Sequence, residues 1–150
     1  MRLRVKARHI PVRLSSGTFI LNSGLEKRTA DEQTAAQIHG FASTAYPMLK
    51  SIDPASFVKL LSAGEIALGA ALLLPVVPTL LAGLGLTAFS AGLVGLYFRV
   101  PGLRREGSLS PTEAGLPIAK DVWLLGSGLG LVLDGLTDGK PTAEAATDPS

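Results

Sequence analysis

The segment from Ile66 to Phe98 carries no charged side chain, and the only prolines in it are Pro75 and Pro78. About 20 apolar residues in a helix cross the hydrocarbon core of a bilayer, and an apolar stretch of roughly 18 already indicates a span. Proline ends a helix because it lacks an N–H donor. The segment therefore predicts two membrane helices, which are antiparallel because so few residues connect them.

The composition agrees with a membrane protein and excludes several classes of function. Of the 150 residues, 47% are hydrophobic and only 17% are charged, compared with about 25% charged in an average soluble domain. The net charge is +2, and no stripe of basic and aromatic residues is present that could follow a nucleic-acid backbone. Because the chain has no cysteine, thiolate catalysis, disulfides and sulfur-ligated metal centres are excluded.

Residues 1–136 are predicted to form one all-α domain, a four-helix transmembrane bundle. Its first helix is only weakly apolar, so one of its faces should pack against other helices rather than lipid. The tail, residues 137–150, is rich in Thr, Ala, Pro and Asp and is expected to be disordered. The predicted spans are residues 10–26, 55–74, 78–98 and 116–136.

Residues 28–54 are too polar to cross a membrane and are predicted to form an insert between the first two spans. Thr29 and Glu32 have the spacing of a capping box, which predicts a short amphipathic helix over residues 30–42. Asp53 followed by Pro54 is a typical N-cap and first-turn pair, so the second span should begin there.

Small residues recur at four-residue intervals within the predicted spans. In a bilayer this spacing lets helix backbones approach closely, because packing rather than hydrophobic burial drives association. The sequence therefore predicts that these positions form the contact faces between helices: Ala63, Ala67, Ala71, Ala88, Gly92, Gly126 and Gly130.

Antiparallel threading brings most of the ionisable groups to one membrane face. Glu65 lies deepest among them, and a charge at that depth normally faces the bundle interior or a partner. This cluster is open to three interpretations: a structural ion-pair network, a polar pocket for a quinone headgroup, small solute or proton, or side chains that only reach the interface. The predicted cluster contains Lys27, Lys59, Glu65, Lys120 and Asp121, and its possible mouth contains Glu26, His39 and Arg99.

The two histidines lie on different segments and neither is expected at mid-membrane depth. His39 belongs to the insert, and His9 belongs to the basic N-terminal segment, where it is expected beside lipid headgroups. This placement does not favour a haem or metal site. No intrinsic cofactor is expected, and the chain is not predicted to be an enzyme on its own.

Short motifs along residues 13–136 resemble the DoxX family of bacterial membrane proteins, in its actinobacterial branch. The first is Arg13-Leu-Ser-Ser-Gly-Thr-Phe followed by Ser23-Gly-Leu-Glu-Lys27. The second is Gly64-Glu65-Ile-Ala-Leu-Gly69, and the third is Lys120-Asp121-Val-Trp-Leu-Leu-Gly126. The loop that begins Arg99-Val-Pro-Gly completes the pattern.

The resemblance implies a four-helix protein of the bacterial inner membrane, associated in some members with quinone-linked sulfur oxidation or oxidative-stress assemblies. It supplies no catalytic residues. Together with the polar cluster, it predicts an accessory subunit that binds a quinone or a partner oxidoreductase, in addition to its bilayer, with both termini in the cytoplasm. The alternatives are a small-solute or proton carrier and a purely structural scaffold.

Overall fold

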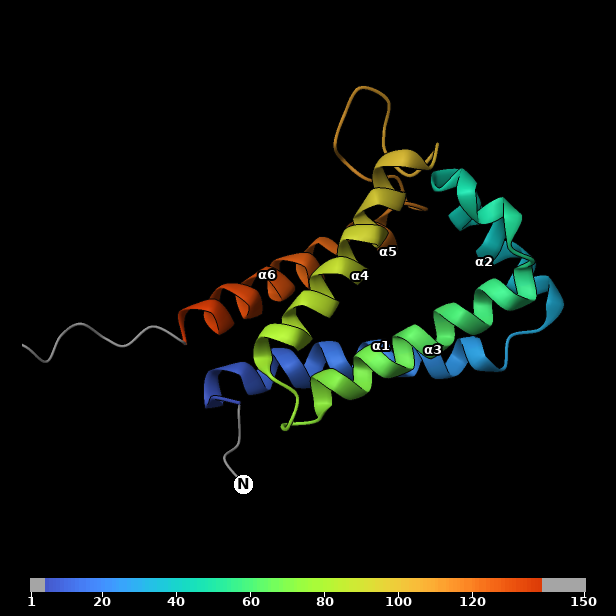
Figure 1. The fold of residues 1–150 in the computed structure, drawn as a ribbon. Coiled ribbons are helices and arrows are strands. Elements are labelled where there is room, and N and C mark those ends of the chain that lie inside the picture. Colours follow the sequence, from blue (N-terminus) through green and yellow to red (C-terminus); the bar gives the residue numbers. More distant parts are fainter. Residues whose placement is uncertain (1–4, 139–150) are drawn as a thin grey trace, which may run out of the picture.

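The chain folds into helices joined by short turns and one longer loop, as seen in a computed structural model that describes residues 5–138 (Figure 1). The predicted all-helical class is confirmed, because the described residues form no β-strand and contain one isolated bridge between Arg104 and Pro111. Most of the predicted tail lies outside the described residues. The α-helices are α1 (Ile10–Arg28), α2 (Glu32–Ala45), α3 (Pro54–Leu73), α4 (Thr79–Arg99), α5 (Leu116–Ala119) and α6 (Val122–Thr137). Two short 3₁₀ helices, η1 (Ala7–His9) and η2 (Pro47–Ser51), precede α1 and follow α2.

Three helical segments within residues 5–138 are long and apolar enough to cross a membrane. They are Pro54–Leu73, Thr79–Arg99 and Leu116–Thr137. The weakly apolar α1 is not among them, although its length of 19 residues would suffice. The structure thus supports a membrane protein with three segments of sufficient length and hydropathy.

Side-chain caps set the starts of two helices, α2 and α3. Asp53 accepts a hydrogen bond from the backbone N–H of Ser56 at 3.0 Å, and Pro54 occupies the first turn of α3, as predicted. That bond stabilises the ionised carboxylate and lowers the pKa of Asp53. The insert helix is capped differently from the prediction. Asp31, not Thr29, accepts the bond from Thr34 N–H at 2.7 Å, so α2 begins two residues later than predicted and extends to Ala45.

The C-terminal span also differs from the prediction. Two residues, Lys120 and Asp121, interrupt it and separate α5 from α6. The predicted end at residue 136 is early by one residue, since α6 continues to Thr137.

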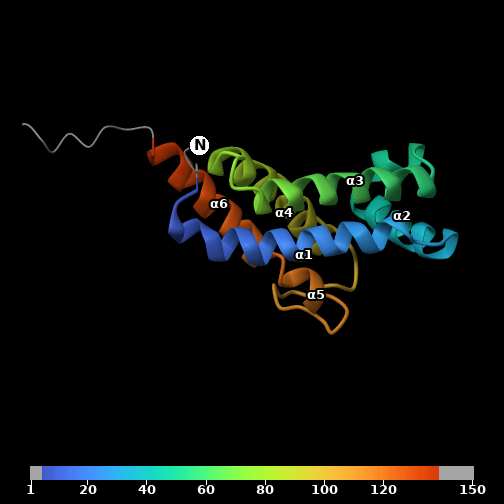
Figure 2. The ribbon, with the colours of Figure 1, turned by 90° about the horizontal axis from the view of Figure 1, so that it is seen from below.

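The helices associate as two pairs, α1 with α3 and α4 with α6. Figure 1 shows α3 and α4 meeting at their connecting turn and diverging toward the end where α2 lies. Viewed from below, α1 runs alongside α3, and α2 lies at the end of this pair that is remote from the N-terminal segment (Figure 2). Ile20, Leu72, Leu86 and Leu131 form the core where the pairs meet.

The close contacts within the pairs involve glycines other than those predicted. A Cβ atom at Gly69 would lie 2.7 Å from the backbone nitrogen of Leu21, and one at Gly128 would lie 2.7 Å from that of Thr87. Gly126, which belongs to the predicted stripe, has nothing within 4 Å of a Cβ atom built on it. The prediction that the small residues at four-residue intervals form the contact face was therefore wrong at Gly126. The small size of a residue does not by itself show which side of a helix faces its partner.

Candidate ligand-binding cavity

A cavity of about 540 Å³ lies between the two helix pairs, on the side covered by α2. Its volume falls within the range of about 300–1,000 Å³ that is usual for small-molecule sites. Most of its wall is apolar, and five aromatic side chains contribute to it. These are Phe19, Phe41, Tyr46, Phe57 and Phe89.

A partly buried ion pair forms a polar part of this wall. Lys27, in the last turn of α1, places its Nζ atom 3.0 Å from Oε2 of Glu65 on α3. Glu65 is only 3% exposed. The ammonium group also donates to the hydroxyl of Ser23 at 2.6 Å. Because a lysine has three N–H donors, one remains available to an acceptor in the cavity.

The approach of α1 to α3 positions this pair. Ser62 on α3 is buried and donates its hydroxyl to the carbonyl of Gly24 at 2.7 Å, one turn before Lys27. Glu65 follows Ser62 by one turn of α3 and so faces the same helix. Removing one member of a buried pair leaves an uncompensated charge and is strongly destabilising. The register of α1 on α3 is therefore tied to Lys27 and Glu65.

Asp121 is the third predicted cluster residue in the cavity wall. It lies at the interruption between α5 and α6 and is partly buried. Its carboxylate makes no side-chain hydrogen bond or ion pair that involves another described residue. The cavity thus presents one paired acid, one paired base and one acid that can accept a hydrogen bond from a ligand.

Lys59 and Lys120 do not join this group. Both are exposed, and neither lines the cavity. Phe57, Leu61 and Glu65 do line it, at intervals of four residues along one face of α3. Lys59 lies two residues from Phe57, which places it on a different face of a 3.6-residue helix. The prediction grouped Lys59 with Glu65 by their position along the chain and did not consider which face of α3 each occupies.

None of the three predicted mouth residues lines the cavity, and two of them, His39 and Arg99, instead hold the cover in place. His39 on α2 contacts the carbonyl of Leu49 at 2.8 Å through Nε2. Arg99 stacks over the Tyr46 ring at 5.2 Å and donates to the carbonyl of Ala45. Glu26 is exposed and accepts from Asn22 at 3.0 Å.

Tyr46 is a cavity residue that the sequence did not indicate. Its hydroxyl donates to the carbonyl of Gly92 at 2.7 Å and so fixes the end of α2 against α4. No periodic pattern marks Tyr46, because it follows the last helical residue of α2.

A second polar cluster, at the opposite end of the helix pairs, was also missed. His9 is 3% exposed, so its predicted place beside lipid headgroups is wrong. It contacts Asp134 on α6 and the hydroxyl of Thr79, and Arg8 forms an ion pair with the same aspartate at 2.7 Å. Arg8 and His9 lie 126 and 125 positions from Asp134 along the chain.

Arg13 lies beside this second cluster, with 2% of its surface exposed. It donates to the backbone carbonyls of Ala71 and Leu72 at 2.8 Å each and also to those of Leu74 and Val77. The last carbonyls of a helix have no partner within it. Arg13 therefore caps the C-terminus of α3 and the turn that follows.

The described residues offer no group of three or more His, Asp or Glu side chains able to hold a metal ion. The side chains of the central cavity can bind an apolar molecule and orient the polar end of that molecule toward Lys27 and Asp121. No protein family, curated protein or solved structure matches this chain.

Proposed function

We propose that this protein is a four-span membrane protein, similar to the DoxX family, that binds a quinone in the central cavity as an accessory subunit of an oxidoreductase. The single observation that carries the proposal is the Lys27–Glu65 pair at the wall of an aromatic-lined cavity of about 540 Å³. A quinone ring stacks on aromatic side chains and its carbonyl oxygens accept hydrogen bonds. The free N–H of Lys27 is the matching donor.

In this proposal α1 supplies the fourth span. Its outer face carries exposed apolar side chains, including Leu14 and Leu25. Its one deep charge, Arg13, has its hydrogen bonds satisfied by backbone carbonyls, which is how charged groups are accommodated within a bilayer. The protein would then lie in the bacterial plasma membrane, with both termini in the cytoplasm and the cavity toward the outer side.

The geometry favours binding over transport. A carrier for a small solute or a proton needs a polar path from the cavity to the other membrane face. Between the cavity and the second polar cluster lies the apolar core of Ile20, Leu72 and Leu86, each less than 2% exposed. A purely structural scaffold, the other alternative, would have no use for the unpartnered carboxylate of Asp121.

The test is quinone binding to the purified full chain. We expect a short-chain quinone to bind the wild-type protein, and the double variant Lys27→Met with Glu65→Leu to bind roughly tenfold more weakly, since a hydrogen bond from a charged donor is lost. Replacing both members avoids a buried unpaired charge. Lys59→Met removes an exposed lysine outside the cavity and serves as the matched control.

Equal affinity in the double variant and the wild type would remove the ion pair from the site. If the wild-type chain binds no quinone, the proposed ligand is wrong. Purification from native membranes in mild detergent tests the partner separately, because an accessory subunit should retain an oxidoreductase.

A further inference from the structure

A second pocket, of about 490 Å³, lies in the loop between α4 and α5 and is separate from the central cavity. The loop is held by its own hydrogen bonds. Arg105 N–H donates to the carbonyl of Ser110 at 2.9 Å, and Thr112 N–H donates to that of Leu103 at 3.0 Å. Leu103 is buried, and Tyr97 donates its hydroxyl to the carbonyl of Leu109 at 2.6 Å. The pocket therefore has a defined backbone frame.

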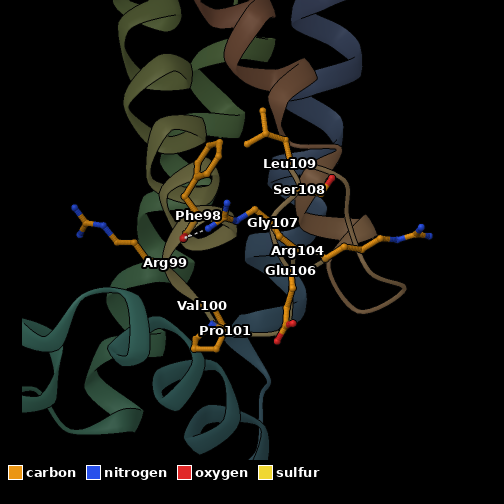
Figure 3. Close-up of a pocket in the computed structure, with 11 residues that line it drawn as sticks. Phe98, Arg99, Val100, Pro101, Arg104, Glu106, Gly107, Ser108 and Leu109 are labelled. Carbon is orange, nitrogen blue, oxygen red and sulfur yellow. Dashed lines mark hydrogen bonds between the residues drawn. The ribbon is translucent and has the colours of Figure 1, made fainter.

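The charged groups of this pocket are mostly cationic. Arg99, Arg104 and Arg105 line it together with a single acid, Glu106. Arg104 lies over the Phe98 ring at 5.3 Å and donates one bond to the Phe98 carbonyl, as Figure 3 shows. Its remaining N–H groups make no hydrogen bond to another described residue, so they can bind an anion. The guanidinium of Arg105 forms no hydrogen bond or ion pair to another described residue.

Apolar side chains accompany these arginines at the same level. Phe98 is 48% exposed and Leu109 is 71% exposed. In Figure 3 both side chains point along the helices, whereas Glu106 points the other way, away from them. Since Phe98 ends a helix that is apolar enough to span a bilayer, this pocket lies at the expected level of lipid headgroups.

We propose that this pocket binds the phosphate of an anionic phospholipid headgroup, with Arg104 and Arg105 as its donors. A guanidinium binds phosphate oxygens through two parallel N–H bonds, which an ammonium group cannot do. The acyl chains of the lipid lie along Phe98 and Leu109. The inference needs α4 to span the membrane, and it is independent of the quinone.

The experiment uses the full-length protein in mild detergent and a fluorescent phosphatidylglycerol as the probe. Three competitors are compared: unlabelled phosphatidylglycerol, phosphatidylcholine and inorganic phosphate. We expect displacement by the first and none by the other two at equal concentration. Each arginine near a membrane surface contributes about a fivefold gain in binding to anionic lipid. Arg105→Gln should therefore weaken binding about fivefold, and the double variant with Arg104→Gln should weaken it further.

Arg28→Gln is the matched control, because Arg28 is exposed at the end of α1 and lies outside the pocket. Arg105→Gln keeps the test decisive even if Arg104→Gln disturbs the loop, since the Arg105 side chain has no partner to lose. Unchanged binding in Arg105→Gln would overturn the proposal, as would equal displacement by phosphatidylcholine. Displacement by inorganic phosphate as effective as that by the lipid would make this a free-anion site and overturn the lipid assignment.

Discussion

The side chain of Arg13 stabilises the turn between α3 and α4 through several backbone partners. Arg13 donates to four carbonyls of α3 and its turn, and it forms no ion pair with a carboxylate of the described residues. Pro75 and Pro78 cannot donate to those carbonyls, because proline has no N–H. A guanidinium is suited to this position because its five donors are arranged in one rigid plane. The contribution of Arg13 is therefore one of geometry as well as charge.

Arg13→Lys retains the charge but only three donors. We expect the free energy of unfolding to fall by about 1.5–3 kcal/mol, because buried carbonyls lose their partners. The measurement is the unfolding of detergent-solubilised protein, by heat or by added SDS. Arg28→Lys makes the same exchange at an exposed position and should change little. Equal stability of both variants would mean that Arg13 is not the cap described above.

Within each helix pair, α1 with α3 and α4 with α6, the two backbones approach most closely at a few positions. On α3 and α6 these are Gly69 and Gly128, and both are buried. The prediction from the sequence instead selected Gly126 and Gly130, which are exposed. Packing without voids makes such contacts sensitive to a single methyl group.

Gly69→Ala should separate α1 from α3, since the new Cβ would lie 2.7 Å from the backbone and Cβ of Leu21. We expect a loss of roughly 1–3 kcal/mol in the free energy of unfolding, as for other overpacked sites. Gly126→Ala adds the same methyl group to open space. It should be neutral or slightly stabilising, because alanine favours helix by up to about 1 kcal/mol over glycine. A comparable loss in both variants would contradict the packing of α1 on α3.

Helix boundaries and face assignments differ in how far the sequence determines them. Asp53 with Pro54 acts over a few residues, so the start of α3 was predicted to within a residue, whereas α2 continues three residues beyond its predicted end at residue 42. The cap of α2 was misplaced because Asp31 competes with Thr29 at nearly the same position. His9 and Asp134 could not have been paired by any local pattern, since they meet only through the fold. Glu65 lies in the cavity wall and Lys59 does not, a difference of helix face that their positions along the chain did not reveal.

At the scale of the whole molecule, the two helix pairs are joined differently at their two ends. The second polar cluster ties the N-terminal segment to α6 through Arg8, His9 and Asp134. At the other end α2 lies across the gap, attached by the Tyr46 bond to Gly92. The central cavity lies near the α2 end. In the four-span proposal, α1 crosses the membrane together with the three helical segments that are long and apolar enough to do so.

Labelling of single cysteines tests the four-span arrangement directly, because the natural chain contains no cysteine. Cysteines placed at Ala7, Ser51, Val76 and Ser108 would all be exposed. In intact cells, a membrane-impermeant maleimide should give the same result, labelled or unlabelled, for the cysteines at Ser51 and Ser108. The cysteines at Ala7 and Val76 should give the opposite result. Labelling of Ala7 on the same side as Ser51 would show that α1 does not cross. Permeabilised cells, in which all four positions should react, provide the control.

The backbone contacts at Gly69 and Gly128 also have an evolutionary consequence. A position that faces lipid can change from one apolar residue to another at little cost in stability. A glycine in contact with the backbone of a neighbouring helix cannot be replaced, because every other residue has a Cβ atom that would clash there. Homologous chains should therefore vary freely at Gly126 and Gly130 and keep glycine at the two buried positions. Substitution rates along α3 and α6 would then record which helix surface meets protein and which meets the bilayer.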